Sequence, residues 1–134
     1  MASFRHLSRI VTMQTLFTYE FHGGDLQQVL DYTMQEFGGK ADKHFVTELL
    51  DGVMKHKQEL QKIITEKAPE WPFDKIAPID RAILEIGAYE ILFSKEVPAV
   101  VAINEAIELA KQYGSENSAK FVNGVLSSVM QAKP

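Results

Sequence analysis

The chain has 134 residues and a mass of 15.1 kDa, with 14 Lys and Arg against 18 Asp and Glu, so its formal net charge is −4. This length predicts one domain, or two small halves of one domain. The negative charge argues against a wholly basic nucleic-acid coat and against a polybasic membrane binder, although it permits a local basic patch. A hydrophobic content of 46% and a charged content of 24% are typical of a folded protein.

The sequence contains no cysteine. This excludes a disulfide scaffold, a zinc site with Cys ligands and thiol catalysis. No apolar run reaches the ~18–20 residues that a membrane-spanning helix needs, and the N-terminus lacks the apolar stretch and cleavage site of a signal peptide. We therefore expect a cytoplasmic protein that does not enter membranes.

Glycine and proline residues divide the chain into segments that are too long for strands and suit amphipathic helices. The predicted helices cover residues 4–21, 26–37, 42–67, 79–93, 98–113 and a last stretch after 115. In the first of these, Phe21 is expected to widen the apolar stripe. Whether residues 42–67 form one helix or two is left open. The sequence thus predicts an all-α fold with six to seven helices.

Several residues are predicted to cap these helices. Asp25 is expected at an N-cap, with Gln28 three residues later as its partner, and Asp42 is expected to open the next helix. Gly114 is the expected C-cap of the helix before it, and Ser115 the expected N-cap of the last helix.

The prolines at 69 and 72 mark the expected boundary inside a single domain of residues 1–134, with an N-terminal half of about 1–68 and a C-terminal half of about 69–134. Trp71 and Phe73 are expected to fold back against the two helical bundles. The segment 79–93 is apolar on nearly all sides, which predicts a buried central helix. Its Arg81 and Glu85 are four residues apart and are expected to pair on the helix surface.

A search for catalytic motifs finds no phosphate loop, dinucleotide fingerprint, HExxH or GxSxG. The four histidines are most simply surface or cap residues, and the many carboxylates suit solvated helix faces. We therefore expect no catalytic residue, no metal site and no cofactor, and we do not expect an enzyme.

Residues 1–19 contain Arg5, His6 and Arg9 but no acidic residue, so this stretch carries +2 and the remainder −6. The two arginines are four residues apart and lie on one helical face. Guanidinium groups suit phosphate, which favours a phosphate-contacting edge. The alternative is an ordinary solvated face, because two arginines make a thin patch.

In the last helix, Asn117, Lys120, Phe121 and Gly124 recur at helical spacing. An aromatic ring beside a lysine can stack an unpaired base while the ammonium meets a phosphate. The alternative is that Phe121 is plain core. Gly124 is expected to permit close approach of a neighbouring helix.

Asp74 and Asp80 form an acidic rim near the start of the buried helix. They either favour the helix dipole or form a docking edge for a basic partner.

The run PAVVAINEAIELAKQYGSENSAKFVNGVL, residues 98–126, closely resembles the C-terminal signature of the NusB family of bacterial transcription antitermination factors. IDRAILEIGAYEIL resembles the family's preceding helix, and SRIVTMQTLF is similar to its first helix. The resemblance covers essentially the whole chain and is weakest from residue 22 to 68.

The resemblance implies two small helical bundles and a non-catalytic role. NusB-like proteins pair with NusE, which is also a protein of the small ribosomal subunit. The pair binds the single-stranded boxA element of nascent RNA and helps assemble an antitermination complex on RNA polymerase, notably on ribosomal RNA operons. Carried over by position, the resemblance implies RNA-binding residues Arg5, His6, Arg9, Gln14, Phe17, Lys120 and Phe121. It implies partner-binding residues Asp74, Asp80 and Asn117.

The chain departs from the family pattern at several positions. Leu7 and Ser8 interrupt a run of arginines, Glu85 stands where an arginine is common, and Val100 replaces a frequent lysine. These three departures remove positive charge, so we expect weak RNA binding without the partner. Asn117 stands where an aspartate is usual.

Two alternatives remain open beside this function. One is a helical scaffold that binds only protein. The other is a stand-alone relative of the RNA-binding domain of ribosomal-RNA cytosine methyltransferases. Self-association into a homodimer is also left open.

Overall fold

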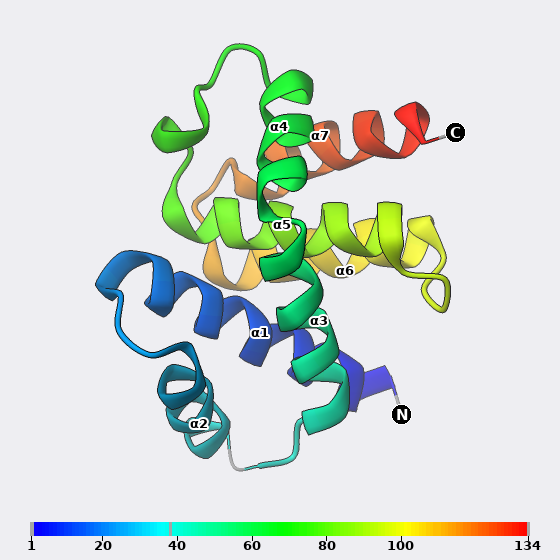
Figure 1. Ribbon diagram of the computed structural model, residues 1–134. Coiled ribbons are helices and arrows are strands. Elements are labelled where there is room, and N and C mark those ends of the chain that lie inside the picture. The colour runs from blue at the N-terminus through cyan, green and yellow to red at the C-terminus, as the bar shows by residue number, and fades with distance from the viewer. Residues whose placement is uncertain (1, 38, 134) are drawn as a thin grey trace. The chain divides into compact units, whose positions relative to one another are not determined.

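The computed structural model describes residues 2–37 and 39–133, and in these residues it contains seven α-helices and one short 3-10 helix, η1 (Figure 1). The expected all-α fold class is confirmed. The helices are α1 Ala2–His22, α2 Leu26–Glu36, α3 Lys43–Lys55, α4 Lys57–Lys67, α5 Pro78–Phe93, α6 Ala99–Tyr113 and α7 Ser118–Ala132, and η1 covers Phe73–Lys75.

The chain divides into two compact units after Gly52. This division falls earlier than the boundary near residue 68 that the prolines suggested. The reason is that α4 packs on α5 and α7, so it belongs to the second unit although it precedes the prolines.

In the first unit, α1 packs on α2, and the apolar stripe of α1 buries Val11, Met13 and Leu16 completely. Asp25 caps α2 as expected, because its carboxylate accepts the backbone N–H of Gln28 at 3.0 Å. The stripe ends earlier than predicted. Phe21 is 64% exposed, so the expectation that it widens the buried face is wrong.

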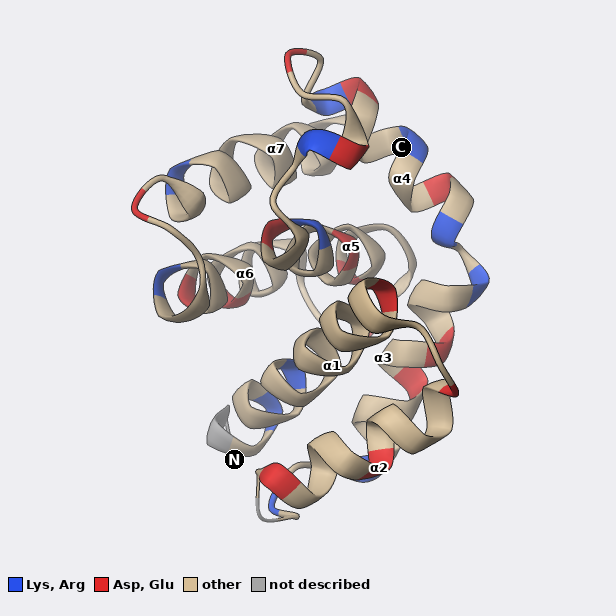
Figure 2. Ribbon diagram, turned by 90° about the vertical axis from the view of Figure 1, so that its left-hand side faces the viewer, with Lys and Arg blue, Asp and Glu red and all other residues tan. Residues whose placement is uncertain are grey.

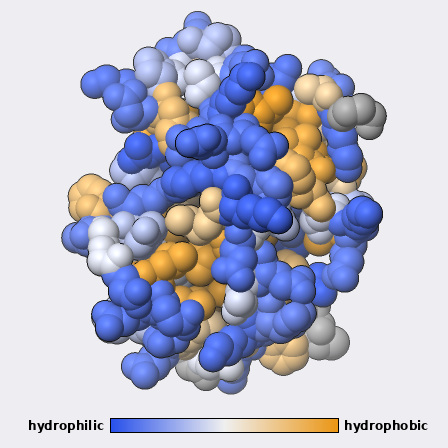
Figure 3. All heavy atoms as spheres, viewed as in Figure 1, coloured by the Kyte–Doolittle hydropathy of each residue, from blue (hydrophilic) through white to orange (hydrophobic). Residues whose placement is uncertain are grey.

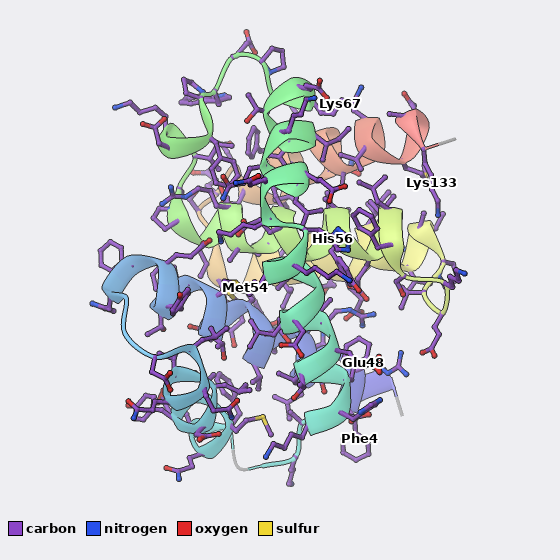
Figure 4. All side chains as sticks on the ribbon, viewed as in Figure 1. Phe4, Glu48, Met54, His56, Lys67 and Lys133 are labelled. Carbon is purple, nitrogen blue, oxygen red and sulfur yellow. The ribbon has the colours of Figure 1, made fainter. Side chains whose placement is uncertain are left out.

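The segment 43–67 forms two helices that meet at His56 (Figure 4). Asp42 opens α3 by accepting the N–H of Phe45 at 3.2 Å. The ring of His56 stacks on Phe93 of α5, with 3.9 Å between the ring centroids, and its Nδ1 lies 3.0 Å from Oε1 of Glu59. These contacts hold the chain at the joint between α3 and α4.

The central helix of the second unit is α5, which packs against α4, α6 and α7. Its expected burial is confirmed. The predicted surface pair of Arg81 and Glu85 is wrong, because Glu85 is fully buried and its Oε2 lies 3.3 Å from Nζ of Lys57 on α4. Burial raises the pKa of Glu85, and the Lys57 ammonium opposes that rise.

The turn between α6 and α7 differs partly from the prediction. Gly114 is the C-cap of α6 as expected, and its N–H donates to Ala110 O at 2.9 Å. The prediction of Ser115 as N-cap is wrong, since Asn117 holds that position. The Ser118 hydroxyl instead accepts the N–H of Ser115 at 2.9 Å, which closes the turn.

The face seen in Figure 3 is mostly hydrophilic, and hydrophobic residues appear in separate patches between hydrophilic ones. Among the described residues, no helix has the length and apolar character needed to cross a membrane.

Candidate nucleic-acid interface

Two cavities in the second unit share three lining residues, Trp71, Asn117 and Phe121. We call the pair the aromatic groove. Trp71 comes from the loop before η1, whereas Asn117 and Phe121 come from the start of α7. The groove therefore lies between the proline-rich loop and the last helix, and it presents two aromatic side chains to any ligand.

The first cavity, the Lys67 cavity, has a volume of about 510 Å³. Two lysines line it, Lys67 at the end of α4 and Lys120 on α7. Its remaining lining residues are Ala68, Pro69, Glu70, Trp71, Asn117, Phe121, Gly124 and Val125. The combination of lysines and aromatic rings suits a ligand that carries both phosphates and bases.

The second cavity, the Asp80 cavity, has a volume of about 400 Å³. Its lining residues are Trp71, Lys75, Ile76, Ala77, Asp80, Ser115, Asn117, Ser118 and Phe121. Asp80 is only 7% exposed, so the prediction of an acidic rim is wrong for this residue. Asp74 on η1 is exposed and lines neither cavity.

The Asp80 carboxylate has one hydrogen bond to the rest of the described chain, from the Ser118 hydroxyl to Oδ2 at 3.1 Å. Its Oδ1 is buried and accepts no hydrogen bond from the described residues. Burial raises the pKa of Asp80, and the bond from Ser118 acts in the opposite direction.

Gly124 opens the groove. A Cβ at this position would meet nothing within 4 Å, so the expectation that Gly124 lets a neighbouring helix approach closely is wrong. The close helix contact occurs instead at Gly87 of α5, where a Cβ would lie 2.5 Å from Cδ1 of Leu126. Gly124 therefore leaves space at the surface beside Phe121.

Trp71 does not plug the core, which corrects the prediction, because its side chain is 52% exposed. Phe73 is half-buried, and the guanidinium carbon of Arg81 lies 5.8 Å from the centroid of its ring. The sequence treated Phe121 as either core or base-stacking. It is half-buried and lines both cavities, so part of the ring is available to a ligand.

The two arginines of the first unit lie in the N-terminal part of α1, where Figure 2 shows basic residues and no Asp or Glu. The guanidinium carbons of Arg5 and Arg9 lie 4.2 and 5.1 Å from the centroid of the Phe45 ring. Arg5 is half-buried, but Arg9 is only 4% exposed. The predicted exposed edge is therefore wrong for Arg9, whose side chain packs against α3.

The remaining predicted residues of α1, His6, Gln14 and Phe17, are all half-buried. The Phe17 ring stacks on Phe21, with 5.8 Å between centroids and an interplanar angle of 6°. Phe21 in turn meets His22 edge to face at 5.0 Å. The C-terminal end of α1 therefore carries a row of three ring side chains, Phe17, Phe21 and His22.

No group of three or more His, Cys, Asp or Glu in the described parts of the chain could hold a metal ion.

Residues 6–131 match the sequence profile described as the NusB family. The chain belongs to the NusB family. It is 35% identical over 132 residues to the transcription antitermination protein NusB of Geobacter sulfurreducens, covering 97% of this chain and 96% of that one. It is 41% identical over 133 residues to NusB of Roseiflexus castenholzii, covering 97% and 94%.

Solved NusB structures share the fold. The chain is similar to T. maritima NusB, with a TM-score of 0.85, 32% identity, and coverage of 96% of this chain and 92% of that one. It is also similar to a chain in the crystal structure of the antitermination factors NusB and NusE in complex with dsRNA. There the TM-score is 0.87, the identity 25%, and the coverage 98% and 99%.

Sequence reasoning placed Asn117, Lys120 and Phe121 at one site, and the structure brings them together with Asp80. It missed the contributions of Trp71, Ser118 and Lys67. A tryptophan one residue before a proline, in a segment that cannot be regular helix, was the available signal for an exposed Trp71. Nothing in the spacing pointed to Ser118, because its contact with Asp80 joins residues 38 positions apart.

Proposed function

We propose that this member of the NusB family is a non-enzymatic transcription antitermination factor that binds a single-stranded boxA-type RNA element together with NusE. It helps assemble the antitermination complex on RNA polymerase during transcription of ribosomal RNA. Its action is non-covalent assembly: stacking of unpaired bases, and release of counterions from a few phosphates.

The observation that carries this proposal is the aromatic groove. Trp71 and Phe121 offer two aromatic side chains, and Lys67 and Lys120 lie in the same cavity. Aromatic faces accept bases of any sequence, and ammonium groups meet the phosphates between them. The similar structure in which NusB and NusE are bound to RNA supports an RNA ligand.

The basic stretch of α1 is a second phosphate contact in this proposal. Arg5 is the arginine of this stretch with partial exposure, and His6 beside it is also half-buried. The guanidinium groups of Arg5 and Arg9 both lie over the Phe45 ring. Because Arg9 is buried, its role in this proposal is to position the Phe45 ring and Arg5. Gln14 and Phe17 continue this surface along α1.

A partner is needed because the chain is acidic overall, with a net charge of −4. A small number of exposed cations gives weak binding at physiological salt. NusE supplies the remaining positive charge, and Asp74 and Asn117 are the acidic and polar side chains that we assign to the junction with it.

The first experiment measures binding of boxA RNA and of a scrambled RNA, with and without the cognate NusE. We expect weak binding by the protein alone, tighter binding with NusE, and preference for boxA. Failure to bind either RNA in the presence of NusE would favour the alternative of a scaffold that binds only protein. Light scattering on the free protein tests whether it associates into a homodimer.

Variants then separate affinity from folding. Phe121→Ala is expected to cost about 1–3 kcal/mol of RNA affinity, with the far-UV circular dichroism spectrum unchanged. Lys120→Ala and Arg5→Ala should each reduce the slope of log affinity against log salt by about 0.7. Lys62→Ala is the matched control, because Lys62 is exposed on α4 and lines neither cavity of the aromatic groove. If Lys120→Ala and Arg5→Ala gave the same salt slope as Lys62→Ala and the unmodified protein, this would contradict the phosphate contacts proposed for Lys120 and Arg5.

A further inference from the structure

We propose that Phe45 on α3 is a positioning residue for RNA binding, because its ring holds the Arg5 guanidinium in place for contact with an RNA phosphate. This inference rests on the proposed RNA-binding function and deepens it. Neither the sequence pattern nor the family resemblance assigns a functional role to Phe45. The proposal therefore joins a residue of α3 to the basic stretch of α1.

Phe45 is in direct contact with that basic stretch. The guanidinium carbon of Arg5 lies 4.2 Å from the centroid of the Phe45 ring, and that of Arg9 lies 5.1 Å from it. Both distances are within the ~6 Å at which an aromatic face attracts a cation. Arg5 and Phe45 are half-buried, whereas Arg9 is 4% exposed. Arg5 is therefore the arginine of the pair that offers accessible surface to a ligand.

Hydrogen bonds fix the place of the ring relative to α1. The hydroxyl of Ser8, which lies in the sequence between the two arginines, accepts the N–H of Asp42 at 2.8 Å. The Asp42 carboxylate in turn accepts the N–H of Phe45 at 3.2 Å. The start of α3 is thus attached to α1 at the residue that separates Arg5 from Arg9. This attachment keeps the Phe45 ring beside both guanidinium groups.

Stacking on a ring and binding of a phosphate use different parts of an arginine side chain. A guanidinium stacks on an aromatic ring through its flat face, whereas its five N–H donors lie in the plane of the group. The contact between Arg5 and Phe45 can therefore persist while Arg5 donates hydrogen bonds to a phosphate.

A side chain that is held before binding loses less entropy when the ligand binds. Ordering a long side chain at an interface costs free energy, and the Phe45 ring restricts Arg5 before RNA arrives. Two guanidinium groups over one ring also repel each other, and a nearby phosphate reduces that repulsion. The N-terminal part of α1 has no Asp or Glu that would repel the phosphate (Figure 2). These effects favour an anionic ligand at Arg5.

The test measures binding of boxA RNA by the full chain with its cognate NusE. Phe45→Leu keeps an apolar side chain and removes the aromatic face. We expect it to weaken RNA binding roughly two- to fivefold, the effect of losing one partly exposed cation–π contact. Phe37→Leu is the matched control, because Phe37 is another half-buried phenylalanine of the first unit and is the C-cap of α2. It should leave RNA affinity unchanged.

A double-mutant cycle shows whether Phe45 acts through Arg5. In the Arg5→Ala background, Phe45→Leu should cause no further loss of RNA affinity. An equal loss in both backgrounds would overturn the proposal, because Phe45 would then affect RNA binding without Arg5.

Pentafluorophenylalanine at position 45 separates electrostatics from packing. The fluorinated ring keeps nearly the shape and the apolar character of phenylalanine, but it reverses the charge distribution by which a ring face attracts a cation. We expect RNA binding at least as weak as that of Phe45→Leu, with an unchanged far-UV circular dichroism spectrum. RNA affinity equal to that of the unmodified protein would overturn the proposal. This measurement also decides the matter if Phe45→Leu does not fold.

Failure of this inference and failure of the proposed function give different results. RNA binding that responds to neither change at position 45 overturns the role of Phe45 and leaves the proposed function standing. A loss confined to the affinity for NusE does the same, since the ring would then be a protein contact. Absence of RNA binding by the unmodified protein with NusE present contradicts the proposed function, and with it the role of Phe45.

Discussion

Nζ of Lys57 lies 3.3 Å from Oε2 of Glu85, and the Glu85 side chain is fully buried while that of Lys57 is 27% exposed. Nε2 of Gln61 donates to the same oxygen at 3.5 Å. The pair joins α4 to α5 inside the second unit. The Glu85 departure from the family pattern therefore removes no positive charge from the surface, because this carboxylate lies in the core and faces a lysine.

Replacing Lys57 with methionine should lower the free energy of unfolding by roughly 2–3 kcal/mol at pH 7. The substitution keeps most of the side-chain volume but leaves the Glu85 carboxylate buried without its cation, which is costly. Urea denaturation measures the change. The double variant Lys57→Met with Glu85→Leu should recover most of the loss, and a double variant as unstable as the single one would show that the pair is not the cause.

Glu85→Gln should change how stability depends on pH. The ordinary pKa of this carboxyl is 4.5, and burial raises it in the folded protein. The folded state therefore binds more protons than the unfolded state between these two values, so the unmodified protein loses stability as pH rises through that window. Glu85→Gln lacks this loss. Its stability relative to the unmodified protein should increase from pH 4.5 upward and then level off, as urea titrations at successive pH values would show; a constant difference would contradict a raised pKa.

The fold was largely predictable because most of its information is local. The 3.6-residue periodicity fixed the helices, and Asp25 and Asp42 marked helix starts that the structure confirms. The joint at His56 was not predictable, because the periodicity continues through it. What holds that joint is the stacking of His56 on Phe93, 37 positions later in the chain.

The site was predictable only in part, because burial depends on contacts between distant segments. Lys120 and Phe121 share a helix, so their spacing placed them together. Arg9 and Asp80 looked exposed by pattern, yet Arg9 packs near Phe45 and Asp80 accepts a hydrogen bond from Ser118. Both contacts join residues more than thirty positions apart, which helical spacing does not reveal.

Gly124 and Gly87 should respond oppositely to alanine. At Gly124 an added methyl group meets open space, so Gly124→Ala should stabilise the protein by about 0.5–1 kcal/mol through helix propensity alone. At Gly87 the methyl group would lie 2.5 Å from Cδ1 of Leu126, which is itself fully buried. Gly87→Ala should therefore cost about 1–2 kcal/mol despite the better propensity. Thermal unfolding of the two variants checks this, and stabilisation by both would mean that the Leu126 side chain can turn away from position 87 at little cost.

Leu7 and Ser8, the two residues that interrupt the family's arginine run, differ in burial and in their contacts. Leu7 is half-buried on α1. Ser8 is fully buried, and its hydroxyl donates to Phe4 O at 2.6 Å and accepts the N–H of Asp42 at 2.8 Å. Ser8 thus ties α1 to the start of α3, and an arginine at this position would bury a charge and break both bonds.

Leu7→Arg should therefore strengthen RNA binding in the presence of NusE and steepen the slope of log affinity against log salt by about 0.7, one additional phosphate contact on a single strand. Leu7→Gln is the control for loss of the apolar side chain without added charge. Ser8→Arg should instead lower the free energy of unfolding by more than about 2 kcal/mol, because it leaves the Asp42 N–H without its acceptor and buries a guanidinium. Salt titrations of RNA binding and urea denaturation distinguish the two variants. A stable Ser8→Arg protein with a steeper salt slope would mean that position 8 faces the RNA after all.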